Sequence, residues 1–209
     1  MIRTEIAVWD LDATLVNSAD SILCTMKAVL HEAGLEVRQD VMMRSTHRPS
    51  SEWYVDYPKP DALHHRHLDL CVTEEYERLI KPIDGAQETL VAWRVPHVIG
   101  TNRDPVTTQR VLLRTGLDRH IRGVAALEPP LRAKPAPDLI LRAIETFGAR
   151  VANAAMIGDS TADMIAAHKA GVPQRIGVTS GVHTAEQLRD AGATLVVRNL
   201  THLRNLIQS

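Results

Sequence analysis

Short apolar segments recur along the chain, and each of them is bounded by polar or glycine residues. Five of them are "EIAVWD" (5–10), "HVIGT" (97–101), "GVAAL" (123–127), "AAMIGD" (154–159) and "QRIGV" (174–178). Continuous apolar runs of this length are typical of strands that are covered on both faces. Amphipathic stretches lie between them from the second onward, so the pattern predicts a parallel α/β sheet with right-handed crossovers. "ATLVV" (193–197) predicts a further strand.

Capping residues, Pro and Gly mark the boundaries of the helices between these strands. Asp104 is an N-cap candidate with Pro105 at the first helical position, and Gly116 ends that helix. The segments "KPAPDLILRAIETFG" and "STADMIAAHKAG" likewise begin with Pro or Ser and end at Gly148 and Gly171. We therefore expect a Rossmann-like parallel sheet with helices on both of its faces.

The first two predicted strands are separated by residues 11–96, which is far more chain than one crossover helix needs. Residues 18–34 have a helical pattern that ends at Gly34, and residues 61–80 return to one after a polar, Pro-interrupted stretch. This arrangement predicts a core made of residues 1–17 and 81–209, with an inserted helical subdomain at 18–80.

Composition excludes several classes of partner. The 24 basic and 25 acidic side chains leave a formal net charge of -1, which argues against nucleic acid or an anionic membrane as a partner. Only Cys24 and Cys71 are present, each in a predicted helix, which indicates reduced thiols in a cytoplasmic protein. No apolar stretch approaches the length of a membrane span, and the N-terminus enters a strand rather than a signal peptide.

Polar residues follow the predicted strands at the edge where ligands of open parallel sheets bind. They are Asp10 and Asp12 after the first strand, Thr101 and Asn102 after the second, Lys134 in the loop after the third, and Asp159 after the fourth. These side chains are expected to converge on one site.

The residue types at this edge suit phosphoryl chemistry. The strand period of two puts Asp10 and Asp12 on the same side, where one carboxylate can attack and the other can carry a proton. Asp159 adds a third carboxylate, and three such groups repel strongly unless a cation such as Mg²⁺ lies among them. Lys134 and the Thr101 hydroxyl supply the donors that a phosphoryl group requires. The expected substrate is a phosphate ester.

Four motifs in this order resemble those of the haloacid dehalogenase superfamily, and most closely its phosphoglycolate phosphatase-like branch with a helical cap. They are "DLDATLVNS", "VIGTN", "KPAPD" and "MIGDSTADMIAAHKAG". The resemblance covers essentially the whole chain and implies that the inserted subdomain is the cap.

The resemblance implies a role for each residue of the site. Asp10 would attack phosphorus and become an aspartyl phosphate, and Asp12 would protonate the leaving oxygen and then deprotonate water. The metal-free dehalogenases lack an aspartate at the position of Asp12, so carbon–halogen cleavage is disfavoured. Mg²⁺ would be held by the side chains of Asp10 and Asp159 and by the carbonyl of Asp12, with Asp163 orienting these ligands. The phosphate would be held by Thr101, Asn102 and Lys134.

One position departs from the family pattern. Ala13 stands between Asp12 and Thr14, where the family usually has Gly. Because Gly tolerates backbone angles that Ala avoids, Ala13 could shift the Asp12 carbonyl that would meet the metal.

The inserted subdomain carries weaker signals. In "MMRSTHRPSSEWY", Arg44, His47 and Arg48 could meet an anionic leaving group, although a polar surface loop fits the same pattern. "HHRH" (64–67) suggests a metal site, but these His residues lie one to three positions apart on a helix and cannot all face one ion. A solvated helix face is the better interpretation.

The hypothesis is therefore a Mg²⁺-dependent phosphomonoester hydrolase that acts on a small phosphorylated metabolite, such as phosphoglycolate. Three alternatives stay open: a phosphomutase or a pyrophosphatase of the same superfamily, and a non-catalytic phospho-acceptor or binding domain. The oligomeric state is open between a monomer and a homodimer.

Overall fold

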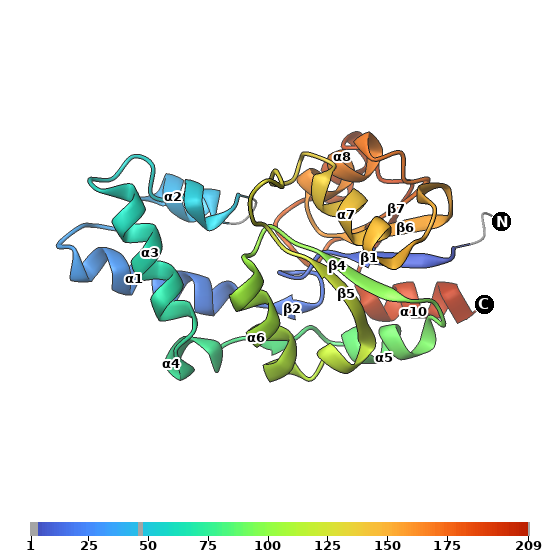
Figure 1. Ribbon diagram of the computed structural model, residues 1–209, viewed down its shortest axis with the longest axis horizontal. Helices are drawn as coiled ribbons and strands as arrows, with labels where there is room; N and C mark the ends of the chain where they lie inside the picture. The colour runs from blue at the N-terminus through green and yellow to red at the C-terminus, as the bar shows by residue number, and fades with distance from the viewer. Residues whose placement is uncertain (1–3, 46–47, 209) are drawn as a thin grey trace.

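A six-stranded sheet organises the molecule. The computed structural model describes residues 4–45 and 48–208, without the side chains of residues 43, 44 and 208 (Figure 1). All neighbouring strands of the sheet are parallel, in the order β5-β4-β1-β6-β7-β8, as the sequence predicts. The strands are β1 (Ile6–Trp9), β4 (His97–Gly100), β5 (Ile121–Ala125), β6 (Ala154–Gly158), β7 (Gln174–Val178) and β8 (Leu195–Val197).

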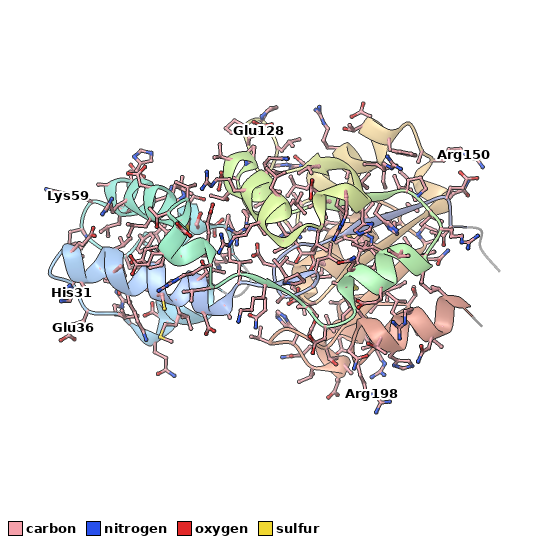
Figure 2. All side chains as sticks on the ribbon, turned by 90° about the horizontal axis from the view of Figure 1, so that it is seen from below. His31, Glu36, Lys59, Glu128, Arg150 and Arg198 are labelled. Carbon is pink, nitrogen blue, oxygen red and sulfur yellow. The ribbon has the colours of Figure 1, made fainter. Side chains whose placement is uncertain are left out.

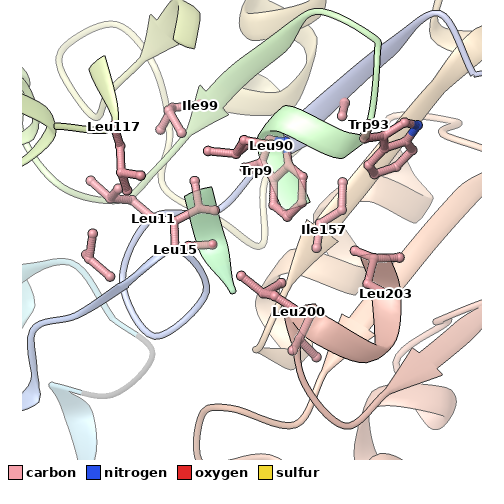
Figure 3. Packing of buried hydrophobic residues seen from close by; sticks show 14 of the residues in the cluster. Trp9, Leu11, Leu15, Leu90, Trp93, Ile99, Leu117, Ile157, Leu200 and Leu203 are labelled. Atoms are coloured by element: carbon pink, nitrogen blue, oxygen red, sulfur yellow. The ribbon is translucent and has the colours of Figure 1, made fainter. Parts of the chain in front are cut away.

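Strand β1 lies inside the sheet, and its four side chains are buried on alternate faces. Ala7 and Trp9 belong to one hydrophobic cluster, and Ile6 and Val8 belong to another. This alternation is the period of two of a strand, and both faces are apolar because both are covered by helices. Figure 3 shows Trp9 packed among side chains of one cluster, including Leu90, Trp93, Ile157, Leu200 and Leu203.

Helices cover both faces of the sheet (Figure 1). The Trp9 face is covered by α5 (Ala86–Ala92), α6 (Pro105–Thr115) and α10 (Leu200–Gln208), and the other face by α7 (Asp138–Phe147) and α8 (Thr161–Lys169). A further helix, α9 (Ala185–Asp190), packs beside β7 and β8, and two 3-10 helices are η2 (Asp118–His120) and η3 (Val151–Asn153).

Two boundaries in the core differ from the sequence prediction. Strand β5 runs from Ile121 to Ala125 rather than over residues 123–127, because it is an edge strand in which residues 121–124 alternate between half-buried and exposed positions and only Ala125 is buried. A search for continuous apolar runs misses such an alternation. Helix α7 begins at Asp138, after the prolines of "KPAPD", where the sequence predicts an earlier start.

The long insertion forms helices around a hydrophobic cluster of its own, which includes Met26, Leu30, Tyr54 and Leu63. Its elements are α1 (Ala19–Glu32), α2 (Gln39–Arg44), the 3-10 helix η1 (Ser50–Glu52), α3 (Pro60–Cys71) and α4 (Glu74–Glu77). Figure 1 shows these helices gathered at one end of the molecule. The helical pattern over residues 61–80 is thus two helices, and the polar stretch between residues 35 and 60 also contains short helices.

A two-stranded antiparallel pair lies where the chain enters and leaves this insertion. Strand β2 (Val16–Asn17) pairs with β3 (Lys81–Pro82), so the two connections run side by side. Exposed charges of both signs, among them Lys59, Glu128 and Arg150, are spread over both ends of the molecule (Figure 2). Within residues 4–45 and 48–208, none of the helices has the length and hydropathy that a membrane-spanning segment needs.

Candidate active site

Three polar side chains follow directly on the ends of adjacent strands. Asp10 follows β1, Thr101 follows β4 and Asp159 follows β6, and all three are almost fully buried. Lys134 reaches the same place from the loop between β5 and α7, where its ammonium group donates to the carbonyl oxygen of Gly100 at 2.9 Å. The carboxyl edge of the sheet therefore gathers these residues into one site, as the strand pattern predicts.

Lys134 is the buried cation of this site. Its Nζ atom donates to Asp10 Oδ1 at 2.5 Å and to Asp163 Oδ1 at 2.6 Å. Burial alone would lower the pKa of Lys134, but the charges of these two carboxylates outweigh it and raise the pKa above its ordinary value. Lys134 therefore stays protonated at any physiological pH.

Negative charge exceeds positive charge at this edge. Asp10, Asp159 and Asp163 each offer a carboxylate oxygen, and these oxygens all lie within 4.8 Å of one another. Burial raises the pKa of Asp159, and the charges of Asp10 and Asp163 raise it further. The pKa of Asp10 is also raised by burial, although Lys134 opposes that shift. A hard cation among these oxygens would relieve the repulsion, so the donor set fits a divalent metal ion.

Asp159 and Asp163 are each held by short-range contacts. The Thr14 hydroxyl donates to Asp159 Oδ1 at 2.9 Å, so Thr14 holds this carboxylate in place. Ser160 is the N-cap of α8, and its backbone N–H and hydroxyl donate to Asp163 Oδ2 at 3.1 and 2.6 Å. Because Lys134 takes the other oxygen, Asp163 is suited to orient its neighbours, which is the role that the family resemblance implies.

Two small residues make room for this arrangement. A Cβ atom on Gly181, in the loop after β7, would lie 1.9 Å from Asp159 Oδ2, so only glycine fits there. Ala13 has φ of 58°, the left-handed conformation that glycine favours. Its carbonyl accepts from the Ser180 hydroxyl at 2.7 Å. Ala13 therefore adopts the glycine-like backbone that the motif requires, at the cost of local strain.

The loop after β4 is tied to the loop that carries Lys134. Asn102 Oδ1 accepts from the backbone N–H of Lys134 at 2.8 Å, and the Thr101 hydroxyl oxygen accepts from the backbone N–H of Arg103 at 3.1 Å. These bonds fix Thr101, Asn102 and Lys134 relative to one another.

Arg103, which neither the strand pattern nor the motifs single out, forms a bidentate ion pair with Asp12. Its Nη2 donates to Asp12 Oδ1 at 2.6 Å and its Nε donates to Oδ2 at 3.1 Å. Burial would raise the pKa of Asp12, but Arg103 and the Ser18 hydroxyl outweigh burial and hold that pKa below its ordinary value. The one available signal was that Arg103 follows Asn102 at the carboxyl edge of the sheet.

A cleft separates these residues from the inserted helices. Its wall on the sheet side includes Asp10, Asp12, Thr101, Arg103 and Lys134. Its opposite wall is formed by Ser21, Ile22, Ser45, Arg48, Ser50, Trp53, His67, Leu68 and Cys71. The expected cap residue Arg48 thus lines the cleft, with its guanidinium half exposed and paired with Glu52. The side chain of Arg44 and the whole of His47 lie outside the described residues.

The prediction of a solvated face for "HHRH" is wrong for His67. His67 is buried, its Nδ1 lies 2.9 Å from the Tyr54 hydroxyl, and its ring packs edge-on against Trp53 at a centroid distance of 5.0 Å. Burial and the nearby Arg103 charge lower the pKa of His67 to about 3, so this residue is neutral. His64 is half-buried, with Nε2 3.1 Å from the Ser50 hydroxyl, whereas His65 is exposed.

Known proteins resemble this chain in both sequence and fold. Residues 7–177 match the family described as haloacid dehalogenase-like hydrolase. A phosphoglycolate phosphatase from Agrobacterium fabrum is 30% identical over 192 residues, covering 84% of this chain and 81% of that protein. A pyrophosphatase, PpaX, from Halalkalibacterium halodurans is 23% identical over 219 residues, covering 96% of this chain and 95% of that protein. A haloacid dehalogenase-like hydrolase structure from Streptococcus pneumoniae covers both chains completely, with 19% identity and a TM-score of 0.87, which shows the shared fold.

Proposed function

The chain belongs to the haloacid dehalogenase-like hydrolases, and on this premise we propose that it is a Mg²⁺-dependent phosphomonoester hydrolase with Asp10 as its nucleophile. The observation that carries the proposal is the buried cluster in which Lys134 bridges Asp10 and Asp163 beside Asp159. Such a cluster offers a nucleophile, a cation and metal ligands at one edge of the sheet. That combination is what phosphoryl transfer requires.

In the proposed reaction, a carboxylate oxygen of Asp10 forms a bond to phosphorus while the bond from phosphorus to the leaving oxygen breaks. Lys134, Thr101 and Asn102 hold the phosphoryl oxygens in the buried loop cluster. Asp12 gives a proton to the leaving oxygen, for which it must first leave Arg103 and become protonated, because the ion pair holds it ionised. In the second step Asp12 takes a proton from water, the water oxygen bonds to phosphorus, and Asp10 is released as a carboxylate.

The metal ligands in this proposal are the side chains of Asp10 and Asp159 and the carbonyl of Asp12, with Asp163 orienting them. A bound Mg²⁺ would offset the negative charge of the carboxylates and of the phosphoryl group. The excess of buried carboxylates over cations, described above, supports this assignment.

We divide the chain into a core, residues 1–17 and 81–209, and a cap, residues 18–80. The β2–β3 pair joins the two parts, and the cleft between them holds the reacting groups. Cap opening would admit the substrate, and closing would exclude water. The leading substrate is phosphoglycolate or another small phosphorylated metabolite, in line with the name of the relative from Agrobacterium fabrum. A pyrophosphatase is the second candidate, because the relative of that name aligns with nearly the whole chain.

The proposal is tested by measuring phosphate release from a panel of phosphate esters and from pyrophosphate. The measurement uses the wild type, Asp10→Asn and Asp12→Asn, each with Mg²⁺ and with EDTA. We expect release that needs Mg²⁺ and is lost in Asp10→Asn. Release of phosphate without metal, or full activity of Asp10→Asn, contradicts the mechanism. A wild type that is inactive on the whole panel favours a phospho-acceptor or binding domain instead.

A further inference from the structure

Both oxygens of the Asp12 carboxylate accept hydrogen bonds from neighbouring side chains. Arg103 binds both oxygens, at 2.6 and 3.1 Å, and the Ser18 hydroxyl donates to Oδ1 at 2.5 Å. Charge-assisted bidentate pairs of this kind are among the strongest hydrogen bonds of proteins. These bonds hold the Asp12 carboxylate against Arg103 and Ser18 and leave its side chain 30% exposed, whereas the proposed reaction needs Asp12 protonated and beside the leaving group.

Arg103 cannot simply be left without its partner. Its side chain is only 11% exposed, and a buried guanidinium that loses its counter-ion is strongly unfavourable. Asp12 can therefore turn away only if another anion takes its place on Arg103.

Among the basic residues of the cleft, Arg103 is the one that contacts the proposed proton carrier. Among the described residues that line it, the basic side chains apart from His67 are Arg48, Arg103 and Lys134. Lys134 contacts Asp10 and Asp163 and is assigned above to the phosphoryl oxygens, and the half-exposed Arg48 contacts Glu52. Of these three residues, Arg103 is the one held by Asp12. Arg103 lines the cleft and contacts Asp12, so the proposed reaction brings the leaving group next to it.

We propose that Arg103 recognises a carboxylate on the leaving group of the substrate and, by exchanging Asp12 for it, frees Asp12 for catalysis. The inference rests on the proposed function. A carboxylate is the anion that fits, because it would replace another carboxylate in the same two-pronged contact with the planar guanidinium. The substrate class is then a phosphate monoester of a small hydroxy acid. An ester with an uncharged leaving group leaves Arg103 on Asp12 and is hydrolysed slowly.

The test compares two esters of the same length, phosphoglycolate and 2-hydroxyethyl phosphate, which differ in the carboxylate. We expect the wild type with Mg²⁺ to prefer phosphoglycolate in kcat/KM by about 100-fold, the discrimination typical of one bidentate ion pair. In Arg103→Gln this preference is expected to disappear, because phosphoglycolate loses affinity and 2-hydroxyethyl phosphate does not. Arg103→Lys is expected to retain part of the preference. Glycolate, as a competitive inhibitor, is expected to bind Arg103→Gln more weakly by a similar factor.

A matched control is Arg66→Gln. Arg66 forms a bidentate ion pair with Glu32 on the cap surface, outside the cleft. Its replacement is expected to leave kcat/KM unchanged for both esters. If Arg103→Gln does not fold, the inference is still tested by comparing the ester preference of the wild type with that of Arg103→Lys.

Three results overturn the inference while leaving Asp10-dependent hydrolysis intact. The first is a wild type without preference for the carboxylate ester. The second is an equal fall in kcat/KM for both esters in Arg103→Gln, which would show that Arg103 only positions Asp12. The third is a stronger preference for an ester whose leaving group carries a second phosphate. Failure of the wild type to release phosphate from any ester would instead reject the proposed function.

Discussion

Lys134 Nζ lies 2.5 Å from Asp10 Oδ1, although 124 positions separate the two residues along the chain. The contact exists because β1 is inside the sheet and the loop after the edge strand β5 returns over its carboxyl end. It pairs the proposed nucleophile with the cation that would hold the phosphoryl group.

Replacing this cation tests both its structural and its chemical role. We expect Lys134→Met to reduce kcat by at least about 100-fold, since it removes a donor to the developing charge. The variant should also lose about 3 kcal/mol of unfolding free energy at neutral pH, because Asp10 and Asp163 lose their buried partner. Urea unfolding and phosphate release measure the two effects. The control Lys27→Met, at an exposed position of α1, should change neither; equal effects of the two variants would contradict the assignment.

Without metal, the Asp10 carboxyl group should lower the stability of the wild type relative to Asp10→Asn as pH rises from about 4 to about 7. The comparison is made with Asp10→Asn because groups such as His67 act in both proteins. Burial raises the pKa of Asp10 from 3.8 to about 7 in the folded protein. A carboxyl group with a higher pKa in the folded state than in the unfolded state costs no stability at a pH below both values. As pH rises from the unfolded pKa to the folded pKa, the free energy of unfolding falls by about 1.4 kcal/mol for each pH unit. Thermal unfolding in EDTA should show a wild-type Tm that falls relative to the Tm of Asp10→Asn over this range, and the difference should be smaller with Mg²⁺. A wild type and an Asp10→Asn variant with identical pH profiles in EDTA would rule the effect out.

Ala13 should be a site where glycine stabilises the protein. Because φ is 58° there, Ala13→Gly relieves the left-handed strain of an L-residue, partly offset by the entropy of glycine. The expected gain is about 0.5 to 1 kcal/mol in unfolding free energy. Ala62→Gly, at an exposed position of α3, should destabilise by a similar amount. Destabilisation by both substitutions in urea unfolding would show that Ala13 is not strained.

Gly181 should be required for metal binding rather than for folding alone. A Cβ atom there would lie 1.9 Å from Asp159 Oδ2, so Gly181→Ala must displace the carboxylate or the loop. We expect Mg²⁺ affinity, followed as the Mg²⁺-dependent rise in Tm, to fall about 10- to 100-fold. Gly34→Ala provides the comparison, because Gly34 also has positive φ but has open space around it. The Mg²⁺ response should survive in Gly34→Ala, and its survival in Gly181→Ala would count against the metal site.

The carboxyl edge could be predicted from the sequence because it depends on local patterns. Buried parallel strands appear as continuous apolar runs, and the residue that ends each run must lie at the edge of the sheet. Asp10, Thr101 and Asp159 were located in this way. Strand β5 was placed two residues late because an edge strand alternates in burial instead of forming such a run.

The cap could not be predicted in the same detail, because its contacts depend on tertiary packing. The burial of His67 depends on Tyr54 and Trp53, which reach it from outside its helix. The Arg103–Asp12 pair depends on the direction of a long side chain that no periodicity encodes. Sequence patterns therefore predict which residues meet at the carboxyl edge, whereas the pairing of Asp12 with Arg103 requires the structure.

The central claim is that Asp10 carries the phosphoryl group during turnover. The most direct test is to quench the wild-type enzyme with Mg²⁺ and substrate in the steady state, reduce it with borohydride, and map the peptides by mass spectrometry. Borohydride converts an aspartyl phosphate into homoserine. We predict homoserine at position 10, and a larger amount in Asp12→Asn if hydrolysis of the intermediate is slowed more than its formation. Turnover with no homoserine at position 10, or with homoserine at another aspartate, would contradict the account.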